Sequence, residues 1–314
     1  MRSHERFTDL DKALKELEQS ITKLAEADID VEEIAKKVKD LREEQYTGIS
    51  RWERLEIARH PERPGAYEFI KSIFDEFWEV YGDRVYGDDP AIIGGLAMLE
   101  GKPIVVIGNR KRSPHKRDYA EYRYGMASPE GYHKATRLME LAEKFDKPVI
   151  TFVDIPGAYP GKEAECKGQA FSIARCISTI VSARVPIVAC IIGEAGSGGA
   201  LALGFGDKII MLEHAFYSSI SPEGFCSIVW GDASHKEIAA DLLKGTGSDL
   251  YKGGVVDYLV KEPLGGAHNN PSKVIEDTSK AIKGFLKDLI SMKKEDMLKA
   301  RAKRVEGLMK KETS

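Results

Sequence analysis

Cysteine is scarce in this chain, and its few cysteines are never close together. The 314 residues include only four, Cys166, Cys176, Cys190 and Cys226. A structural zinc site usually needs pairs of cysteines two residues apart, because two of its ligands come from one tight turn. We therefore expect no metal in this chain, and scattered single cysteines fit a reducing compartment.

Long apolar runs and targeting segments are also missing. The longest apolar run, near Val185–Ile192, is broken by Gly193, and it is far shorter than the roughly 20 residues that cross a membrane as a helix. The first residues, MRSHERFTDLDK, have no apolar core, so they read neither as a signal peptide nor as a transit peptide. We expect a soluble cytoplasmic protein without membrane contact, or a stromal protein if the source is a plastid.

Neither sign of charge dominates. The net charge is −3, from 47 basic and 50 acidic residues, which gives no overall attraction to nucleic acid or membranes. One basic stretch stands apart, and it contains Arg110, Lys111, Arg112, Lys116 and Arg117. These side chains are candidates to contact a phosphate or an acidic partner, and the alternative is a solvated loop. Tyrosines follow the stretch, but the overall charge argues against nucleic acid.

The first 60 residues do contain a strong helical period. Apolar residues recur at steps of three and four, first at Phe7, Leu10, Leu14, Leu17, Ile21 and Leu24, and then, after a break at 28–30, at Val31, Ile34, Val38 and Leu41. This spacing predicts an antiparallel helical hairpin. A hairpin is too small to hold its own core, so we expect residues 1–60 to pack on a partner or on the remainder of the chain, residues 61–314.

Residues 61–314 show an α/β pattern. Strands are predicted at 91–98, 103–108, 148–154, 186–193, 208–212, 216–220 and 255–260, and helices at 66–82, 130–145, 165–183, 198–204, 222–231, 234–245, 271–291 and 293–311. Short buried strands that alternate with helices predict parallel pairing with right-handed crossovers. The first two strands form a hairpin, so the repeating unit is ββα. The helices from about residue 271 form a C-terminal extension, and the last of them, at 293–311, is basic.

Two glycine-rich loops that follow buried strands are the strongest functional signal. The first, Asp154–Gly161, reads DIPGAYPG, and its prolines and glycines give a rigid backbone that a ligand can approach closely. The second, Gly193–Ala200, reads GEAGSGGA and opens a helix, so it presents backbone N–H groups to an anion or a developing oxyanion. Parallel strands would place both loops at one edge of the sheet. The alternatives are a stiff turn and a tightly packed helix start.

The second loop departs from three well-known motifs. No Gly-Lys-Ser/Thr follows it, so it is not a P-loop, and Leu201 stands at the last glycine of a GxGxxG pattern. Ala195 replaces the first glycine of a GxSxG nucleophile elbow around Ser197. Backbone donors in two adjacent loops favour stabilisation of an enolate or oxyanion without a side-chain nucleophile. A serine hydrolase that uses Ser197 and a noncatalytic scaffold are the alternatives.

Several strings together resemble one known family. They are DIPGAYPG, GEAGSGGALALG at 193–204, the two SPEG strings at 128–131 and 221–224, and EPLGGAH at 262–268. The chain resembles the alpha subunits of bacterial and plastid acetyl-CoA carboxylase carboxyltransferases, from about Arg59 to Pro271. The resemblance implies a crotonase (ClpP-like) fold, a spiral of ββα units. It also implies transfer of the carboxyl group of carboxybiotin, held on a biotin carboxyl carrier protein, to acetyl-CoA, which gives malonyl-CoA for fatty acid synthesis.

The resemblance further implies partners and site residues. A beta subunit would share the active site in an α2β2 assembly and would hold the structural zinc, and a biotin carboxylase would complete the complex. The oxyanion donors facing the ureido oxygen of biotin would be the backbone N–H groups of Gly157, Ala158, Gly198 and Gly199. Carboxybiotin would also contact Tyr159, Pro160, Glu194, Gly196 and Ser197. Ile155, Ala195, Lys162 and Cys166 depart from the usual loops, and another biotin-dependent acyl-CoA carboxyltransferase or decarboxylase is the alternative.

Overall fold

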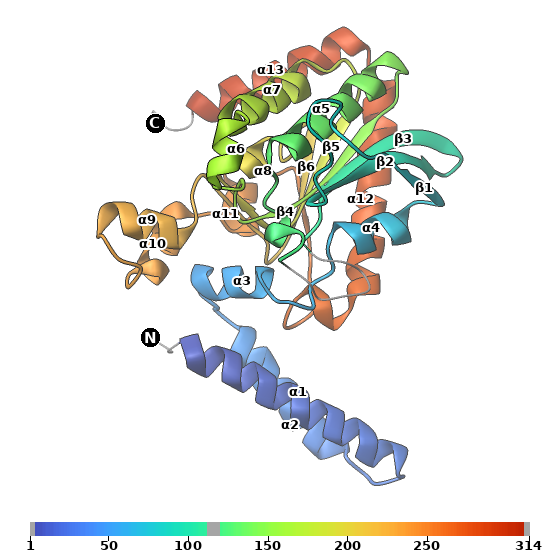
Figure 1. Ribbon diagram of the computed structural model, residues 1–314. Coiled ribbons are helices and arrows are strands. Elements are labelled where there is room, and N and C mark those ends of the chain that lie inside the picture. The colour runs from blue at the N-terminus through green and yellow to red at the C-terminus, as the bar shows by residue number, and fades with distance from the viewer. Residues whose placement is uncertain (1–3, 112–119, 311–314) are drawn as a thin grey trace.

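A single twisted sheet forms the centre of the molecule (Figure 1). The computed structural model describes residues 4–111 and 120–310. Within them the sheet has eight strands in the order β1-β2-β3-β4-β5-β6-β8, and β7 pairs with the end of β5. The strands are β1 Glu76–Glu79, β2 Ile92–Leu99, β3 Lys102–Asn109, β4 Val149–Ile155, β5 Ile187–Gly196, β6 Lys208–Leu212, β7 Phe216–Ser218 and β8 Tyr258–Val260. Pairing is parallel from β3 onward and antiparallel for β1-β2-β3, as the ββα pattern predicted.

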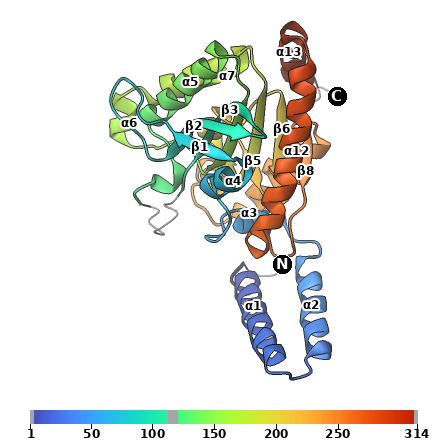
Figure 2. The same cartoon turned by 90° about the vertical axis from the view of Figure 1, so that its right-hand side faces the viewer.

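The central strands form because their apolar runs are buried on both faces. Every residue of β4 and of β5 is buried, which is typical of parallel strands covered by helices on both sides. On one face lie α5 Pro129–Lys144 and α7 Gln169–Ser182, and on the other lie α4 Ala66–Ile73 and α12 Pro271–Ser291 (Figure 2). The strand ends therefore emerge from a rigid three-layer core.

Two predicted helices are wrong in part. The helix predicted at 66–82 ends at Ile73, and the chain continues as β1, an edge strand with alternating exposure that pairs with β2. The helix predicted at 165–183 is split into α6 Lys162–Cys166 and α7, because Gly168 between them adopts a φ of +82°. A short helix, α11 Gly247–Lys252, lies beyond α9 Pro222–Val229 and α10 Lys236–Leu243 and was not predicted.

The predicted N-terminal hairpin is present and projects away from the sheet (Figures 1 and 2). It consists of α1 His4–Glu26 and α2 Glu32–Tyr46, and α3 Arg51–Ala58 joins it to the body. Leu14 and Val38 are buried, but apolar side chains of the predicted seam stay 40–54% exposed: Leu17, Leu24, Ile34 and Leu41. The described part of the chain therefore leaves much of this seam uncovered.

The basic C-terminal helix, α13 Lys294–Lys310, is anchored to the body by arginines. Arg301 is 2% exposed and forms an ion pair with Asp207, with an N–O distance of 2.7 Å. The same guanidinium donates to the carbonyl oxygens of Ile180, Ala183 and Val185, at the carboxyl end of α7. Some of the basic side chains of this helix therefore make contacts within the protein. No helix among the described residues is long and apolar enough to span a membrane.

Candidate active site

The two glycine-rich loops meet at the carboxyl ends of β4 and β5, as predicted. Ile155 of β4 pairs with Ala195 of β5, and the loops continue from there in direct backbone contact. A Cβ atom at Gly196 would lie 2.0 Å from the carbonyl oxygen of Pro156, and a Cβ at Gly199 would lie 2.7 Å from the nitrogen of Ala158. Only glycine allows this approach at both positions.

Backbone donors are free where the loops touch. Within the described chain, no hydrogen bond engages the N–H groups of Gly157, Ala158, Gly198 or Gly199. Gly157, Ala158 and Gly198 are half-buried, and Gly199 is buried. Unpaired N–H groups at partly buried positions are costly unless something else accepts them. The contact region is therefore suited to bind an oxygen that carries negative charge.

Asp154 holds the bulge that separates the loops. The register of β4 against β5 shifts between Val153 and Ile155. At this bulge the Asp154 carboxylate accepts a hydrogen bond of 3.0 Å from the Glu194 nitrogen. It also pairs with Lys111 at 2.6 Å. A Cβ at Gly193 would lie 2.2 Å from the same carboxylate. Asp154 and Gly193 thus shape the bulge from which the second loop leaves β5.

Glu194, a predicted carboxybiotin contact, is held by an arginine that the sequence did not reveal. Arg59, just after α3, donates to both Glu194 oxygens at 2.8 and 2.6 Å and also binds Glu223, in the second SPEG string. Burial lowers the pKa of Arg59, but the hydrogen bonds that it donates to the two carboxylates outweigh burial and raise that pKa, so the guanidinium stays charged. This cluster ties α3 and α9 to the second loop.

Gln169 and Arg123 support the first loop. Sequence patterns give no sign of Gln169, and they associate Arg123 only with the basic stretch at 110–117. The Gln169 side-chain nitrogen donates to the carbonyl oxygens of Ala127 and Tyr159, each at 2.9 Å, and the Tyr159 nitrogen donates to Ala127 at 3.0 Å. The Arg123 guanidinium lies 5.1 Å from the centre of the Tyr159 ring. Gln169 is buried at the first turn of α7. The Gln169 side chain therefore fixes the Tyr159–Pro160 peptide of the first loop, while Pro160 stays exposed.

A buried phenol lies beside the contact between the loops. Tyr132 of α5 is fully buried, and its hydroxyl has no hydrogen-bond partner in the described part of the chain. A Cβ at Gly199 would lie 2.7 Å from that hydroxyl oxygen. Burial raises the pKa of Tyr132 well above its usual value, so the phenol keeps its proton.

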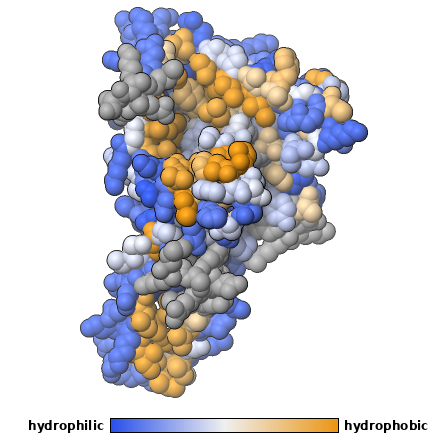
Figure 3. Space-filling view, turned by 90° about the vertical axis from the view of Figure 1, so that its left-hand side faces the viewer, coloured by the Kyte–Doolittle hydropathy of each residue, from blue (hydrophilic) through white to orange (hydrophobic). Residues whose placement is uncertain are grey.

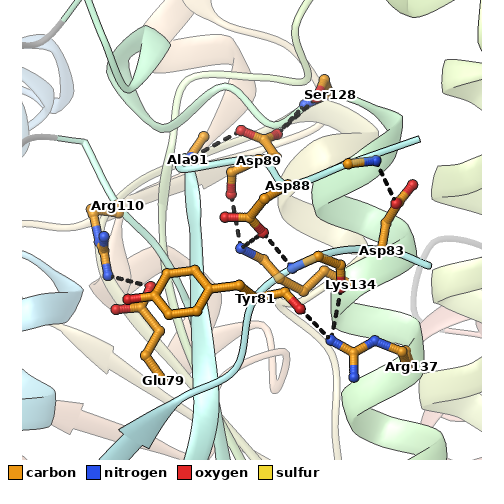
Figure 4. A network of polar contacts seen from close by, with 12 residues as sticks. Glu79, Tyr81, Asp83, Asp88, Asp89, Ala91, Arg110, Ser128, Lys134 and Arg137 are labelled. Carbon is orange, nitrogen blue, oxygen red and sulfur yellow. Dashed lines mark hydrogen bonds and ion pairs between the residues drawn. The ribbon is translucent and has the colours of Figure 1, made fainter. Parts of the chain in front are cut away.

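An aspartate network positions α5 and therefore Tyr132 (Figure 4). The Asp89 carboxylate accepts hydrogen bonds from the Ser128 nitrogen and hydroxyl at 2.7 and 2.9 Å. Lys134 is fully buried and donates to Asp88 and to the Asp89 carbonyl at 2.7 and 2.9 Å. The first SPEG string is thus a helix start held by a carboxylate from the loop before β2, which favours its amino end.

The basic stretch begins beside the site and is partly used inside the protein. Arg110 pairs with Glu79 at 2.7 Å and Lys111 with Asp154 at 2.6 Å. These pairs occupy two of the five cations considered for phosphate or partner contact. The other three, Arg112, Lys116 and Arg117, lie outside the described residues.

Ser197 occupies the turn between β5 and α8 Ser197–Leu201, and among the described residues its hydroxyl has no partner that would activate it as a nucleophile. It is exposed and has a φ of +59°, and it borders an apolar groove of about 860 Å³ that includes Gly198, Leu201 and Tyr217. In the described part of the chain, no imidazole bonds to its hydroxyl. Because the described residues provide no general base for Ser197, this geometry does not support a serine hydrolase.

The EPLGGAH string lies behind β5 and braces it. Arg63 donates to the Ile192 carbonyl at 2.7 Å and to both oxygens of Glu262 at 2.7 and 2.6 Å. Both side chains of this ion pair are at most 2% exposed. His60 stacks on His268 with 3.7 Å between ring centres. No group of three metal-ligating side chains occurs among the residues that the structure describes.

The sequence matches known proteins over nearly its whole length. Residues 3–309 match a family described as acetyl co-enzyme A carboxylase carboxyltransferase-like. The chain is 44% identical to an acetyl-coenzyme A carboxylase carboxyl transferase subunit alpha of Geobacter metallireducens, over 93% of this chain and 94% of that one. It is 43% identical to the protein of the same name in Haemophilus influenzae, over 96% and 98% of the two chains.

Solved structures confirm the predicted crotonase-like α/β fold. A chain of transcarboxylase 12S superposes with a TM-score of 0.60 at 18% identity, over 74% of this chain and 43% of that one, so this chain spans less than half of it. A chain of a Pseudomonas malonate decarboxylase hetero-tetramer superposes with a TM-score of 0.58 at 17% identity, over 72% and 93%. Since the family match and the relatives extend over nearly the whole sequence, the chain belongs to the family of acetyl-CoA carboxylase carboxyltransferase alpha subunits.

Proposed function

We propose that this chain, together with a beta subunit, transfers the carboxyl group of carboxybiotin to acetyl-CoA and forms malonyl-CoA. Family membership supports the activity. The observation that carries the proposal is the contact between two glycine loops whose N–H groups at Gly157, Ala158, Gly198 and Gly199 have no acceptor in the described chain. Such an arrangement favours chemistry in which negative charge develops on an oxygen and no protein nucleophile takes part.

In this proposal the chain contributes binding and fixed dipoles. Carboxybiotin, when bound, supplies the carboxyl group. The four N–H groups donate to the ureido oxygen, where negative charge grows as the carboxyl group leaves. Removing one such donor from an enzyme typically costs about 10²–10³ in rate. Arg59 neutralises Glu194, so that carboxylate does not repel the developing charge. Tyr159, Pro160, Gly196 and Ser197 are the proposed walls of the carboxybiotin site.

A beta subunit is the proposed partner, and exposed apolar side chains on helices tied to the second loop support it. Apolar side chains are exposed on the projecting pair α9–α10, including Ile228 at 77%, Val229 at 53% and Leu242 at 58%. Figure 3 shows apolar surface gathered on this face, over that pair and along the hairpin. Exposed apolar patches of this kind often mark protein interfaces. We also propose that the two subunits assemble as α2β2 and that residues 1–60 pack against a partner. Further proposed partners are a biotin carboxyl carrier protein and a biotin carboxylase, and the proposed location is the cytoplasm.

Reconstitution tests this function. The chain is purified alone and together with a beta subunit, and malonyl-CoA formation from acetyl-CoA and carboxybiotin is measured in both samples. We expect activity only in the mixture, and full activity of the chain alone would contradict the shared site. Propionyl-CoA and other acyl-CoA substrates are compared in the same assay. Preference for one of them over acetyl-CoA would replace the proposed substrate by a related acyl-CoA, and mass measurement of the intact complex gives the stoichiometry.

A further inference from the structure

A large groove lies at the end of the sheet opposite to the active-site loops. It holds about 1720 Å³ of empty space, counting the part open to solvent. One wall consists of α12 and the start of α13. The other contains the chain around the amino ends of β3, β4 and β5. Parallel strands place their carboxyl ends, and therefore the glycine loops, at the other edge. The groove is thus separate from the site described above.

The groove combines an apolar floor with a basic rim. Its floor includes Leu99, Ile104, Leu286 and Met297, and Ile290 stands at its edge. Six basic side chains line it against two acidic ones: Lys102, Lys147, Arg184, Lys283, Lys287 and Lys294 against Glu100 and Asp146. Lys102, Lys147 and Lys287 form no ion pair within the described chain. The charge of this surface therefore complements an anion that has an apolar body.

Two ion pairs join the walls and limit what can enter. Lys283 of α12 pairs with Glu100, in the turn between β2 and β3, at 2.9 Å. Lys294 of α13 pairs with Asp146, in the loop before β4, at 2.7 Å. A partner helix is about 10 Å wide with its side chains, and it would have to break these connections. A single hydrocarbon chain needs far less width and leaves both pairs intact.

Gly284 keeps the middle of the groove open. It lies in the interior of α12, where glycine is less favourable than alanine. A Cβ atom there would meet nothing within 4 Å. Packing within the described chain therefore does not require glycine at this position, although any larger side chain would extend toward the groove that Gly284 lines.

We propose that this groove binds a single-chain amphiphile with a carboxylate head, of the fatty-acid type. The hydrocarbon chain lies on the apolar floor beside Gly284, and the carboxylate is bound by the unpaired lysines of the rim. This binding is independent of carboxyl transfer and involves no residue of the glycine loops.

Calorimetric titration of the full-length chain with monomeric laurate tests the proposal. We expect binding that is about tenfold tighter than that of dodecyltrimethylammonium, which has the same chain and the opposite charge. Gly284→Phe fills the groove and should weaken laurate binding by about tenfold or more, with an unchanged or raised Tm. Gly307→Phe is the matched control, because Gly307 is another exposed helical glycine whose Cβ would meet nothing and it lies outside the groove.

Charge variants and the assembled complex complete the experiment. The double variant Lys102→Gln/Lys287→Gln should weaken laurate binding roughly threefold to tenfold and leave the binding of neutral dodecanol unchanged. Equal binding by wild type and Gly284→Phe, or equal affinity for the two charged amphiphiles, would overturn the proposal. So would loss of laurate binding when the beta subunit is added, because the groove would then be a subunit interface. Each readout is independent of malonyl-CoA formation.

Discussion

Gly199 and Ala158 are in backbone contact across the two glycine loops: a Cβ added to Gly199 would lie 2.7 Å from the Ala158 nitrogen. Gly199→Ala should therefore force the loops apart and misdirect the donors. We expect kcat of the assembled enzyme to fall about 10²-fold. The KM for acetyl-CoA should change little if, as we propose, the beta subunit holds most of that substrate. Steady-state kinetics measure kcat and KM, and a melting curve shows whether the variant is still folded.

Gly198→Ala is the matched control for that variant. Its Cβ would lie 3.5 Å from a methyl group of Ile173, which is an ordinary contact, and the N–H group is retained. We expect kcat within a fewfold of the wild type. An equal loss in both variants would show that the spacing of the loops is not the deciding factor.

Gln169 should act as a positioning residue for the first loop. Gln169→Leu removes two hydrogen bonds of 2.9 Å and frees the Tyr159–Pro160 peptide, which follows Ala158 in the first loop. Since a lost hydrogen bond costs about 1–1.5 kcal/mol, we expect kcat to fall about tenfold, with a smaller effect on KM. Ser178→Ala, at an exposed position of the same helix, is the control. A variant that loses thermal stability but keeps its kcat would assign Gln169 a structural role only.

Ser197→Ala distinguishes oxyanion chemistry from nucleophilic catalysis. The side chain has no imidazole partner in the described structure, but its backbone belongs to the turn before Gly198. We expect carboxyl transfer close to the wild-type rate. A loss of about 10³-fold or more, together with labelling of the wild type by a fluorophosphonate, would instead identify a serine nucleophile.

The buried cluster behind β5 should make the protein sensitive to acid. Burial lowers the pKa of His214 to about 4, and Arg54 donates a hydrogen bond to its ring nitrogen. Burial raises the pKa of Glu262, but Arg63 outweighs it, so the pKa falls to about 2. Both groups bind protons more readily in the unfolded chain. Stability should therefore fall from about pH 6.5 toward 4 through His214, and further from about pH 4.5 toward 2 through Glu262.

Urea unfolding over this range measures the effect. Within each window, one pH unit costs up to about 1.4 kcal/mol per group. His214→Gln should flatten the curve between pH 6.5 and 4, whereas His235→Gln, at an exposed position, should not. Unchanged acid sensitivity of His214→Gln would contradict the assignment.

The sequence pattern predicted the central strands of the sheet and the loops that follow them. The apolar runs at 148–154 and 186–193 correspond to β4 and β5, and the glycine loops after them meet as expected. The helix predicted at 66–82 is correct as far as Ile73 and wrong beyond it, because the apolar residues Tyr67, Ile70, Ile73, Phe74 and Phe77 suit a helix by spacing alone. The second half instead pairs with β2 as an edge strand. Pairing between distant segments overrides local periodicity there.

The supports of the site could not be read from the sequence for a related reason. Gln169 is an isolated glutamine near a helix start, and Arg59 is one arginine among many. Each matters only through residues that are distant in the chain: Ala127 lies 42 positions before Gln169, and Glu194 lies 135 positions after Arg59. The donor loops could be recognised because their glycines and prolines are unusual within a short stretch.

The anchoring of α13 bears on the order in which parts of the protein fold during synthesis. The carbonyls at the carboxyl end of α7 accept hydrogen bonds from Arg301, which follows them by more than 110 residues. A chain still on the ribosome lacks that guanidinium until more than 110 further residues have been synthesised after α7. The helix that carries Gln169 at its other end is therefore expected to reach its final packing, and the active-site loops to mature, only after α13 has been synthesised.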